Sequence, residues 1–568
     1  MTLTFALFRA FLRPIRTVAL TVIACTTATT ALAVTCKVAT AATPSEADTA
    51  FLHSDYNHAA TLYQQELQQK PRDPELTVKL ARVFLKQQKI SDADALVHNA
   101  LAQDPNSVAF LTMLGEVQYR EGTPWLAADS AANAMKADPC YPRLYLLVAR
   151  IARLNSLYAA SANAVATAYA LDPHDPEIHF QWLGTLPLKQ RAAELESYLA
   201  QPNGNDAEDT RDLHFQLDYL KQRIVETHKA CRLVSDTQAA TIPFALILRD
   251  PSHILGFGLD VKLNNKSTRL EIDTGAGGLV ISRSVAERAG LKVFSRFETA
   301  GIGDKGRVGS YTTYADDIKI GSLEFRDCEV EVIDKGNVAG IDGLIGMDVF
   351  SRFLVTLDYP MRKLVLGPLS PRPGDTTPNK PSLETDSNED AADLDAGSNG
   401  TTNEPPASSS KATSSPALHD RYIAPEMKDW TPVYRIGHNL LIPTSLNNSA
   451  LKTFVLDTGA FTTTISPAAA REVTKVHSDG SITVKGISGE VNKVYTADEI
   501  TFRFGHASQK VRGVVTFDSP QLSKDLNMEV SGLIGITALG QLTMSIDYRD
   551  GLVKLSYDPN RGYQHSAY

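Results

Sequence analysis

The tetrapeptide Asp-Thr-Gly-Ala occurs twice in this chain, at residues 273–276 and 457–460. Each copy follows an apolar run and precedes Ile-Ser, so that the two segments read LEIDTGAGGLVIS and FVLDTGAFTTTIS. A single copy would carry little information, because such short strings recur by chance. Two copies in the same local context predict a duplicated structural unit, and this duplication constrains the fold more than any other feature of the sequence.

Two further blocks follow each tetrapeptide in the same order. The block DGLIGMDVF at 342–350 corresponds to SGLIGITAL at 531–539. The block TLDYPMRKLVL at 356–366 corresponds to SIDYRDGLVKL at 545–555. Around these blocks, short alternating runs rich in valine, isoleucine and threonine are typical of β-strands. We therefore expect two copies of an all-β domain of about 120 residues.

These blocks resemble the retropepsin-like and pepsin-like aspartic proteases over residues 242–368 and 432–557. In that family each lobe supplies one Asp-Thr/Ser-Gly loop, and a later apolar-apolar-Gly segment braces it. The Leu-Ile-Gly segments at 344–346 and 533–535 stand in the bracing position. The resemblance implies two all-β lobes that form a pseudo-two-fold pair. It also implies an aspartic endopeptidase that acts on peptide or protein substrates without a cofactor.

The resemblance identifies Asp273 and Asp457 as the catalytic pair. Hydrolysis by carboxyls alone needs one group to take a proton from water while the other gives a proton to the carbonyl oxygen. Two carboxyls held a few ångströms apart cannot both ionise, so the pair keeps one proton. In the alternative interpretation, both are turn residues of inactive domains. The residues expected to support the loops and face the substrate are Thr274, Gly275, Thr458 and Gly459.

Two glycine-containing segments, at 300–314 and 484–498, suit the tips of hairpins. They are interpreted either as flaps over the substrate or as ordinary surface hairpins. Retroviral members of the family often place an acid two residues beyond the glycine of the triad. Gly277 and Phe461 stand there in this chain. This departure predicts two lobes whose contacts with substrate differ.

Residues 45–230 follow a different, helical pattern. The dipeptide Asp-Pro recurs every 34 residues, at 104–105, 138–139 and 172–173, and small residues stand at fixed positions before each proline. Small residues let the two helices of a hairpin approach closely, and the proline stops the second helix. The period resembles the tetratricopeptide repeat, which implies an all-α solenoid that recruits a protein partner or the substrate. A generic helical bundle is the alternative.

Residues 1–41 are interpreted as an export signal. Three arginines precede the apolar run TVALTVIACTTATTALAV at 17–34, and small residues follow it. Cleavage near Ala33 or Ala41 is expected; the alternatives are an uncleaved membrane anchor and lipidation at Cys25. Each interpretation exports the rest of the chain to the periplasm or beyond the cell. The chain would then contact a membrane only through a retained signal or a lipid.

Residues 371–424 are rich in proline, serine, threonine, asparagine and aspartate and hold almost no large apolar residue. Such a segment cannot offset its ordering entropy by burial, so we expect a disordered linker. Its length permits the two lobes to pair within one chain, and equally permits pairing between two chains.

The net charge, the histidines and the cysteines argue against several other kinds of protein. A formal net charge of -9 argues against nucleic-acid binding, and the 13 histidines show no metal-ligand spacing, so no metal is expected. The cysteines are so widely spaced that we expect no disulfide framework, and interpret Cys140, Cys231 and Cys328 as small apolar packing residues. The sequence thus favours an exported aspartic endopeptidase with helical repeats. A catalytically silent peptide-binding scaffold is the alternative.

Overall fold

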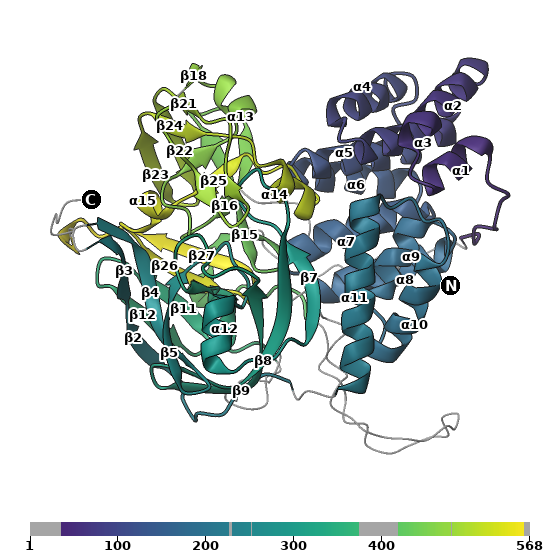
Figure 1. Cartoon of the computed structure of the whole chain (residues 1–568). Coiled ribbons are helices and arrows are strands. Elements are labelled where there is room, and N and C mark those ends of the chain that lie inside the picture. The colour runs from purple at the N-terminus through teal and green to yellow at the C-terminus, as the bar shows by residue number, and fades with distance from the viewer. Residues whose placement is uncertain (1–35, 227–229, 251–252, 374–418, 479, 562–568) are drawn as a thin grey trace. The chain divides into compact units, whose positions relative to one another are not determined.

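The computed structural model describes residues 36–226, 230–250, 253–373, 419–478 and 480–561 (Figure 1). Most of the predicted signal and most of the predicted linker lie outside these ranges. The described chain is helical from Glu46 to Val225 and rich in strands from Arg232 onward. It divides into two compact units, Met1–Ile151 with Ser161–Trp182 and Ala152–Ala160 with Leu183–Tyr568.

In the N-terminal region the first six helices pack consecutively, and the last three share an apolar cluster. They are α1 (Glu46–Leu52), α2 (Tyr56–Gln69), α3 (Pro74–Lys86), α4 (Ile90–Leu101), α5 (Val108–Arg120), α6 (Pro124–Ala137), α7 (Pro142–Leu154), α8 (Tyr158–Leu171) and α9 (Pro176–Leu183). α4, α6 and α8 end shortly before the three Asp-Pro pairs, as expected for a residue that cannot continue a helix. Small residues set the spacing: a Cβ on Gly115 of α5 would lie 2.5 Å from Leu147 Cδ2 and 3.3 Å from the Ala127 carbonyl oxygen.

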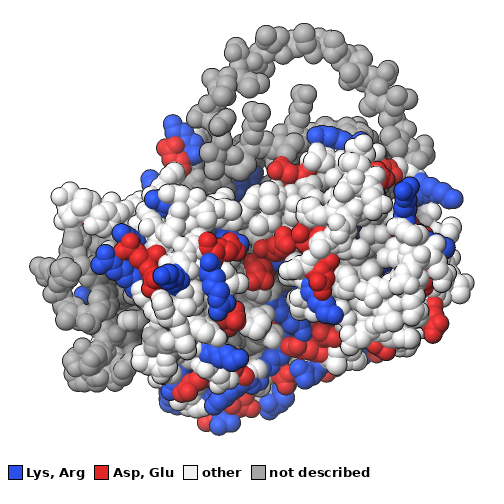
Figure 2. Space-filling model, turned by 90° about the horizontal axis from the view of Figure 1, so that it is seen from above, with Lys and Arg blue, Asp and Glu red and all other residues white. Residues whose placement is uncertain are grey.

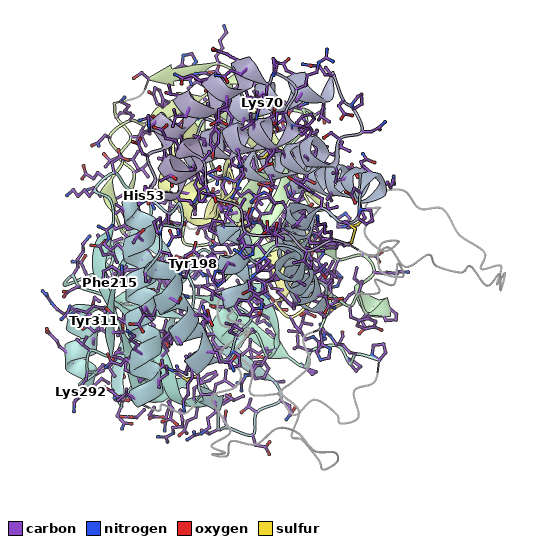
Figure 3. All side chains as sticks on the ribbon, turned by 90° about the vertical axis from the view of Figure 1, so that its right-hand side faces the viewer. His53, Lys70, Tyr198, Phe215, Lys292 and Tyr311 are labelled. Atoms are coloured by element: carbon purple, nitrogen blue, oxygen red, sulfur yellow. A yellow bond between two sulfur atoms is a disulfide. The ribbon has the colours of Figure 1, made fainter. Side chains whose placement is uncertain are left out.

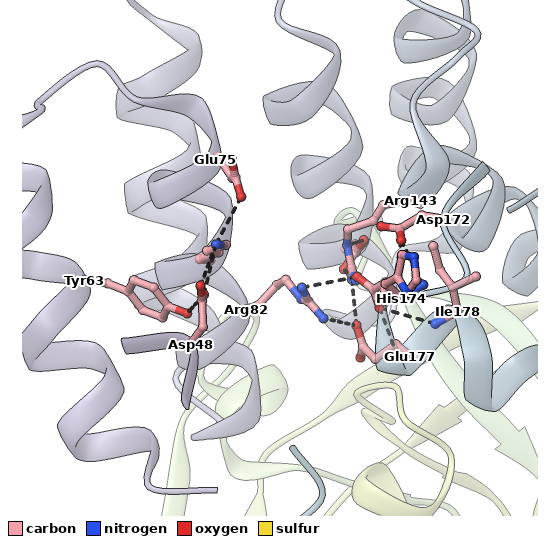
Figure 4. Close-up of polar contacts among 12 residues, drawn as sticks. Asp48, Tyr63, Glu75, Arg82, Arg143, Asp172, His174, Glu177 and Ile178 are labelled. Carbon is pink, nitrogen blue, oxygen red and sulfur yellow. Dashed lines mark hydrogen bonds and ion pairs between the residues drawn. The ribbon is translucent and has the colours of Figure 1, made fainter. Parts of the chain in front are cut away.

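A network of charged side chains is buried among these helices (Figure 4). Arg143 of α7 donates to both carboxylate oxygens of Glu116 at 3.1 and 2.8 Å, and to Asp175 at 2.8 Å and Glu177 at 2.7 Å. Arg82 of α3 pairs with the same Asp175 and Glu177. Burial alone would raise the pKa of Glu177, but the two arginines outweigh it and hold that pKa well below its ordinary value. The network therefore fixes α3, α5, α7 and the start of α9 relative to one another.

Within the part of the chain that the structure describes, two disulfides join segments distant in sequence. Cys36 is bonded to Cys140 in the first unit, and Cys231 to Cys328 in the second. The interpretation of Cys140, Cys231 and Cys328 as unpaired packing residues is therefore wrong. The bonded residues are 104 and 97 positions apart, so the pairing follows from the fold and leaves no local spacing in the sequence.

The second unit begins with two helices and continues into strands. α10 (Leu188–Leu199) packs on α11 (Ala207–Val225), and α11 packs on β7 (Ser295–Thr299). In Figure 3, the labels Tyr198 and Phe215 mark α10 and α11, and the labels Tyr311 and Lys292 mark the strand-rich part that follows. Near the end of α11, Arg223 donates to the hydroxyl of Tyr314 at 2.7 Å. These helices are therefore anchored to the strands that follow.

The first β region, residues 232–367, forms a sheet in the order β1-β9-β6-β10-β5-β4-β8-β7, with β3 on β4. Its other strands are β1 (Arg232–Leu233), β3 (Ala245–Asp250), β4 (His253–Leu263), β5 (Lys266–Ile272), β6 (Leu279–Ser282), β8 (Val308–Ile320), β9 (Leu323–Ile333) and β10 (Gly343–Ile345). β10 lies between β5, to which it is parallel, and β6, to which it is antiparallel. Residues 283–289 form α12 (Arg283–Ala289).

The second β region, residues 431–556, repeats this arrangement in the order β18-β21-β24-β17-β25-β16-β15-β22-β23, with β14 on β15. The strands are β14 (Tyr434–Ile436), β15 (Asn439–Leu446), β16 (Leu451–Leu456), β17 (Thr464–Ile465), β18 (Val476–Ser478), β21 (Tyr495–Ala497), β22 (Ile500–Phe504), β23 (Ala507–Val511), β24 (Val514–Thr516) and β25 (Gly532–Ile534). β25 lies between the parallel β16 and the antiparallel β17, as β10 lies between β5 and β6.

A third sheet takes strands from both β regions, in the order β13-β27-β26-β11-β12-β2 (Figure 1). Its strands are β2 (Ala240–Pro243), β11 (Leu354–Asp358), β12 (Lys363–Gly367), β13 (Thr431–Pro432), β26 (Thr543–Asp547) and β27 (Leu552–Ser556). β11 pairs with β26, and Thr356 lies directly opposite Ser545, with 2.9 Å between their hydroxyl oxygens. These are the first residues of the two aligned sequence blocks, so the duplicated segments meet at equivalent positions.

On the face shown in Figure 2, acidic and basic side chains lie among one another. No helix within the described residues has the length and apolarity that a bilayer crossing requires.

Candidate active site

Asp273 and Asp457 stand at equivalent points, immediately after β5 and β16. The backbone N–H of Asp273 donates to Ile345 of β10 at 3.0 Å, and that of Asp457 donates to Ile534 of β25 at 3.1 Å. The Leu-Ile-Gly segments thus continue the parallel ladder up to the aspartate in each region. Ile345 and Ile534 are fully buried, so each loop rests on an apolar support.

The two threonines join the loops by reciprocal hydrogen bonds. Thr274 N donates to Thr458 Oγ1 and Thr458 N donates to Thr274 Oγ1, both at 3.1 Å. Thr274 Oγ1 in turn donates to the Leu456 carbonyl at 2.7 Å, and Thr458 Oγ1 to the Ile272 carbonyl at 3.0 Å. All four bonds are buried, so each loop is held by the other as firmly as by its own strand.

The glycines allow the two aspartates to approach. A Cβ on Gly459 would lie 2.5 Å from Asp273 Cγ, and a Cβ on Gly275 would lie 2.9 Å from Asp457 Cγ. Such contacts are too short for real atoms, so each loop must carry a glycine for the opposite carboxyl to fit. The six residues named from the sequence, Asp273, Thr274, Gly275, Asp457, Thr458 and Gly459, are therefore brought to one place by the fold.

The electrostatics of the pair favour one retained proton. Burial, followed by the charge of Asp457, raises the pKa of Asp273 well above its ordinary value. Burial also raises the pKa of Asp457, but hydrogen bonds to that carboxyl oppose the rise. The N–H groups of Gly459 and Ala460 both donate to Asp457 Oδ1 at 2.9 Å, whereas Asp273 Oδ1 accepts from a single described N–H, that of Gly275, at 2.7 Å. Since the two carboxyls share a hydrogen bond, they titrate as a unit, and the additional N–H donors at Asp457 favour the negative charge on that side of the pair.

Sequence reasoning missed His438, which lies in the turn between β14 and β15 of the second region. Its Nε2 is 3.1 Å from the carbonyl oxygen of Gly275, in the loop of the first region. A Cβ on Gly277 would lie 2.5 Å from His438 Nδ1, so the absent side chain at 277 provides the space for this imidazole. At the equivalent place in the second region, Phe461 is 53% exposed. No motif in the sequence marks His438, because the contact joins residues 163 positions apart.

The two segments interpreted as flaps meet. The turn between β7 and β8 faces the hairpin of β19 (Lys485–Gly486) and β20 (Gly489–Glu490). Asp304 N donates to the Glu490 carbonyl at 3.0 Å, Lys305 N to the Ser488 carbonyl at 2.9 Å, and Ser488 N to the Ile302 carbonyl at 3.1 Å. Ile487 packs on an apolar cluster of the first region that also includes Ala276 of the Asp-Thr-Gly-Ala loop. The hairpins thus hold each other next to that loop.

The start of α11 is tied to both β regions by ion pairs. Glu208 pairs with Arg307, at the base of the first hairpin, and with Lys524 of α14 (Pro520–Asp525), each at 2.6 Å. Arg307 also reaches Asp525 at 3.2 Å. The hydrogen bonds from Lys524 and Arg307 lower the pKa of Glu208 to about 2. We call Glu208, Arg307, Lys524 and Asp525 the α11 clamp.

Comparison with known proteins agrees with both parts of this description. A family model described as aspartyl protease matches residues 259–349, and one described as tetratricopeptide repeat matches residues 50–117. The chain therefore contains an aspartyl protease domain and tetratricopeptide repeats, as the sequence motifs predicted.

Individual proteins match over parts of the chain. DNA damage-inducible protein 1 of Neurospora crassa is 31% identical over 112 residues, which are 19% of this chain and 24% of that protein. The chain thus matches about a quarter of the length of this relative. Among solved structures, a thermophilic TPR protein of Thermus thermophilus is similar at 23% identity and a TM-score of 0.24. That match covers 29% of this chain and 90% of the other.

Within the described residues, no group of three or more histidine, cysteine, aspartate or glutamate side chains is arranged to hold a metal ion.

Proposed function

We propose that this protein is an exported aspartic endopeptidase in which Asp273 and Asp457 of one chain hydrolyse peptide bonds. The observation that carries the proposal is the reciprocal contact of the two loops, through Thr274 with Thr458 and through each glycine with the opposite carboxyl. Reciprocal contacts of this kind are typical of a two-fold arrangement. The direct pairing of Thr356 with Ser545 supports the same pseudo-two-fold relation between two lobes.

In the proposed mechanism, a water molecule binds between the two carboxyls. Asp457, whose charge is stabilised by two N–H groups, takes a proton from this water as its oxygen attacks the peptide carbonyl carbon. Asp273 gives its proton to the carbonyl oxygen in the same step. When the tetrahedral intermediate collapses, the amine leaves with the proton held by Asp457 and the new carboxylic acid returns a proton to Asp273. The pair is then ready for the next cycle.

The disulfides support export, because disulfides persist mainly in oxidising compartments. Cys36 lies before Ala41 and after Ala33, so the Cys36–Cys140 bond survives signal cleavage only if the cut falls near Ala33. A lipid on Cys25 or a retained signal would preserve it as well. We propose that the mature chain begins before Cys36, and that its helical repeats recruit a protein partner or the substrate. N-terminal sequencing of the exported protein gives the position of the cut.

The experiment compares the purified exported protein with its Asp273→Asn and Asp457→Asn variants on a denatured protein substrate between pH 3 and 7. Either substitution is expected to lower kcat by at least about 1,000-fold, because each removes one half of the acid–base pair. Asp316→Asn, which removes an exposed carboxylate of β8, is the matched control and is expected to retain activity. A wild type that cleaves nothing across this range would leave only the peptide-binding scaffold. Activity that depends on one of the two aspartates alone would disprove the single-chain pair.

A further inference from the structure

A third carboxyl lies beside the pair. Glu271 is two residues before Asp273 on β5, and side chains alternate between the faces of a strand. Leu270 and Ile272 point into the core, where they are 0% and 1% exposed. Glu271 therefore occupies the opposite face, which is the face of Asp273.

The side chain of Glu271 leans toward the aspartate. Glu271 lies opposite Gly258 of the antiparallel β4, so Gly256 is the β4 residue that stands level with Asp273. A Cβ on Gly256 would overlap Glu271 Oε1. The carboxyl therefore extends over Gly256, toward the end of the sheet where the catalytic pair lies.

Glu271 has no partner for its charge among the described residues. No hydrogen bond or ion pair of the described side chains reaches its carboxyl, and its pKa is raised to about 8 by burial and then by the charge of Asp457. A buried carboxyl next to two others therefore stays protonated until a positive charge is brought beside it. The equivalent residue of the second region is Val455, which is buried and apolar.

The surface next to Glu271 is apolar. Leu344 of β10 is its neighbour across the ladder, and Val280 of β6 is the neighbour of Leu344. Both belong to the apolar cluster on which Ile487 of the hairpin packs. An apolar wall that ends in a single carboxyl matches a lysine or arginine side chain, whose long aliphatic stem packs on carbon while its charged end seeks an acid.

We propose that Glu271 determines specificity and selects substrates that carry lysine or arginine next to the scissile bond, on the side of the first β region. This inference rests on the proposed peptidase function. The cationic side chain of the substrate pairs with Glu271, which ionises as that side chain binds. A substrate with an apolar side chain there leaves Glu271 protonated and gains no such pairing.

The test uses two sets of peptides that differ only at the residue on either side of the cleaved bond, which is arginine in one set and leucine in the other. The readout is the ratio of kcat/KM for arginine over leucine, because a purely structural role of Glu271 would change both peptides alike. In the wild-type full-length exported protein this ratio is expected to be about tenfold or more at one of the two positions, as a buried charge-assisted hydrogen bond provides. Glu271→Gln is expected to bring this ratio close to one. Glu271→Asp keeps a carboxyl and is expected to give a ratio between those of the wild type and Glu271→Gln.

Glu287→Gln is the matched control, because Glu287 is an exposed residue of α12 and its loss changes the net charge equally. Its ratio is expected to equal that of the wild type. A wild type that cleaves both peptides at similar rates, or a Glu271→Gln variant that keeps the wild-type ratio, overturns the specificity inference and leaves the peptidase proposal intact. Absence of cleavage of every peptide overturns both.

Discussion

The two β regions share the same supports but differ in the residues that they place next to Asp273 and Asp457. In both, an inner strand brings a buried isoleucine beneath the aspartate and a threonine crosses to the other loop. Beside these supports, the first region has Glu271 where the second has Val455. A symmetric dimer would carry each residue twice, whereas a duplicated chain encodes each half separately. The residues that hold Asp273 and Asp457 are alike in the two regions, and the residues beside them differ.

The largest expected effect concerns the shared supports. Thr274→Val and Thr458→Val each leave a buried N–H and a buried carbonyl without a partner, and each is expected to lower the free energy of unfolding of the second unit by about 2–4 kcal/mol. The two losses should be nearly equal, because the bonds are reciprocal. Thr→Ser at either position keeps the hydroxyl and serves as the control in denaturant unfolding. Clearly unequal losses of unfolding free energy would show that the two loops do not support each other equally.

Substitution of the two loop glycines tests how closely each loop approaches the opposite carboxyl. Gly459→Ala is expected to lower kcat/KM by about 100-fold, because a methyl group 2.5 Å from Asp273 Cγ must displace that carboxyl. Gly275→Ala places its methyl group 2.9 Å from Asp457 Cγ and is expected to cost less. The ratio of the two kcat/KM values measures the difference. A larger loss for Gly275→Ala would contradict the geometry of the pair.

His438 should affect only the acid limb of the pH profile of kcat/KM. Burial raises the pKa of Asp457, and a positive charge on His438 would oppose that rise. In the proposed mechanism Asp457 must be ionised to accept a proton from water. His438→Ala is therefore expected to raise that pKa and move the acid limb of kcat/KM toward higher pH. Phe461→Ala, at the position of the second region that matches Gly277, removes no charge and should leave the limb in place. An acid limb that moves down in His438→Ala would reverse the assigned roles.

The smallest effect is expected at the α11 clamp. The pKa of Glu208 is lowered from 4.5 to about 2, so its contribution to stability is present above pH 4.5 and is lost as the pH falls through 2. Glu208→Gln should make the melting temperature less dependent on pH in this window. The change should stay below about 1 kcal/mol and decrease in salt, because the pairs are partly exposed. Asp316→Asn is the control, and a steeper acid dependence in Glu208→Gln would contradict the clamp.

The features that repeat along the chain could be predicted from the sequence. The contacts that the fold makes between segments of different sequence could not. The 34-residue period predicted the repeats, and the duplicated Asp-Thr-Gly-Ala predicted the protease domain, because in both cases the same physical requirement recurs at a fixed spacing. The Cys36–Cys140 and Cys231–Cys328 bonds and the place of His438 beside Gly277 depend on segments far apart in the chain, and the lean of Glu271 over Gly256 depends on the register of two neighbouring strands. Among these, only the glycine at 277 left a trace, as a departure from the family pattern.

The sheet that contains β11 and β26 has a consequence for a molecule cut between residues 374 and 418. The two pieces would still be joined by the pairing of β11 with β26 and by the contact between the hydroxyls of Thr356 and Ser545. Such a nicked protein should migrate as one particle under native conditions and separate into two pieces only in denaturant. Proteolytic trimming in that interval would then leave the two Asp-Thr-Gly-Ala loops in contact.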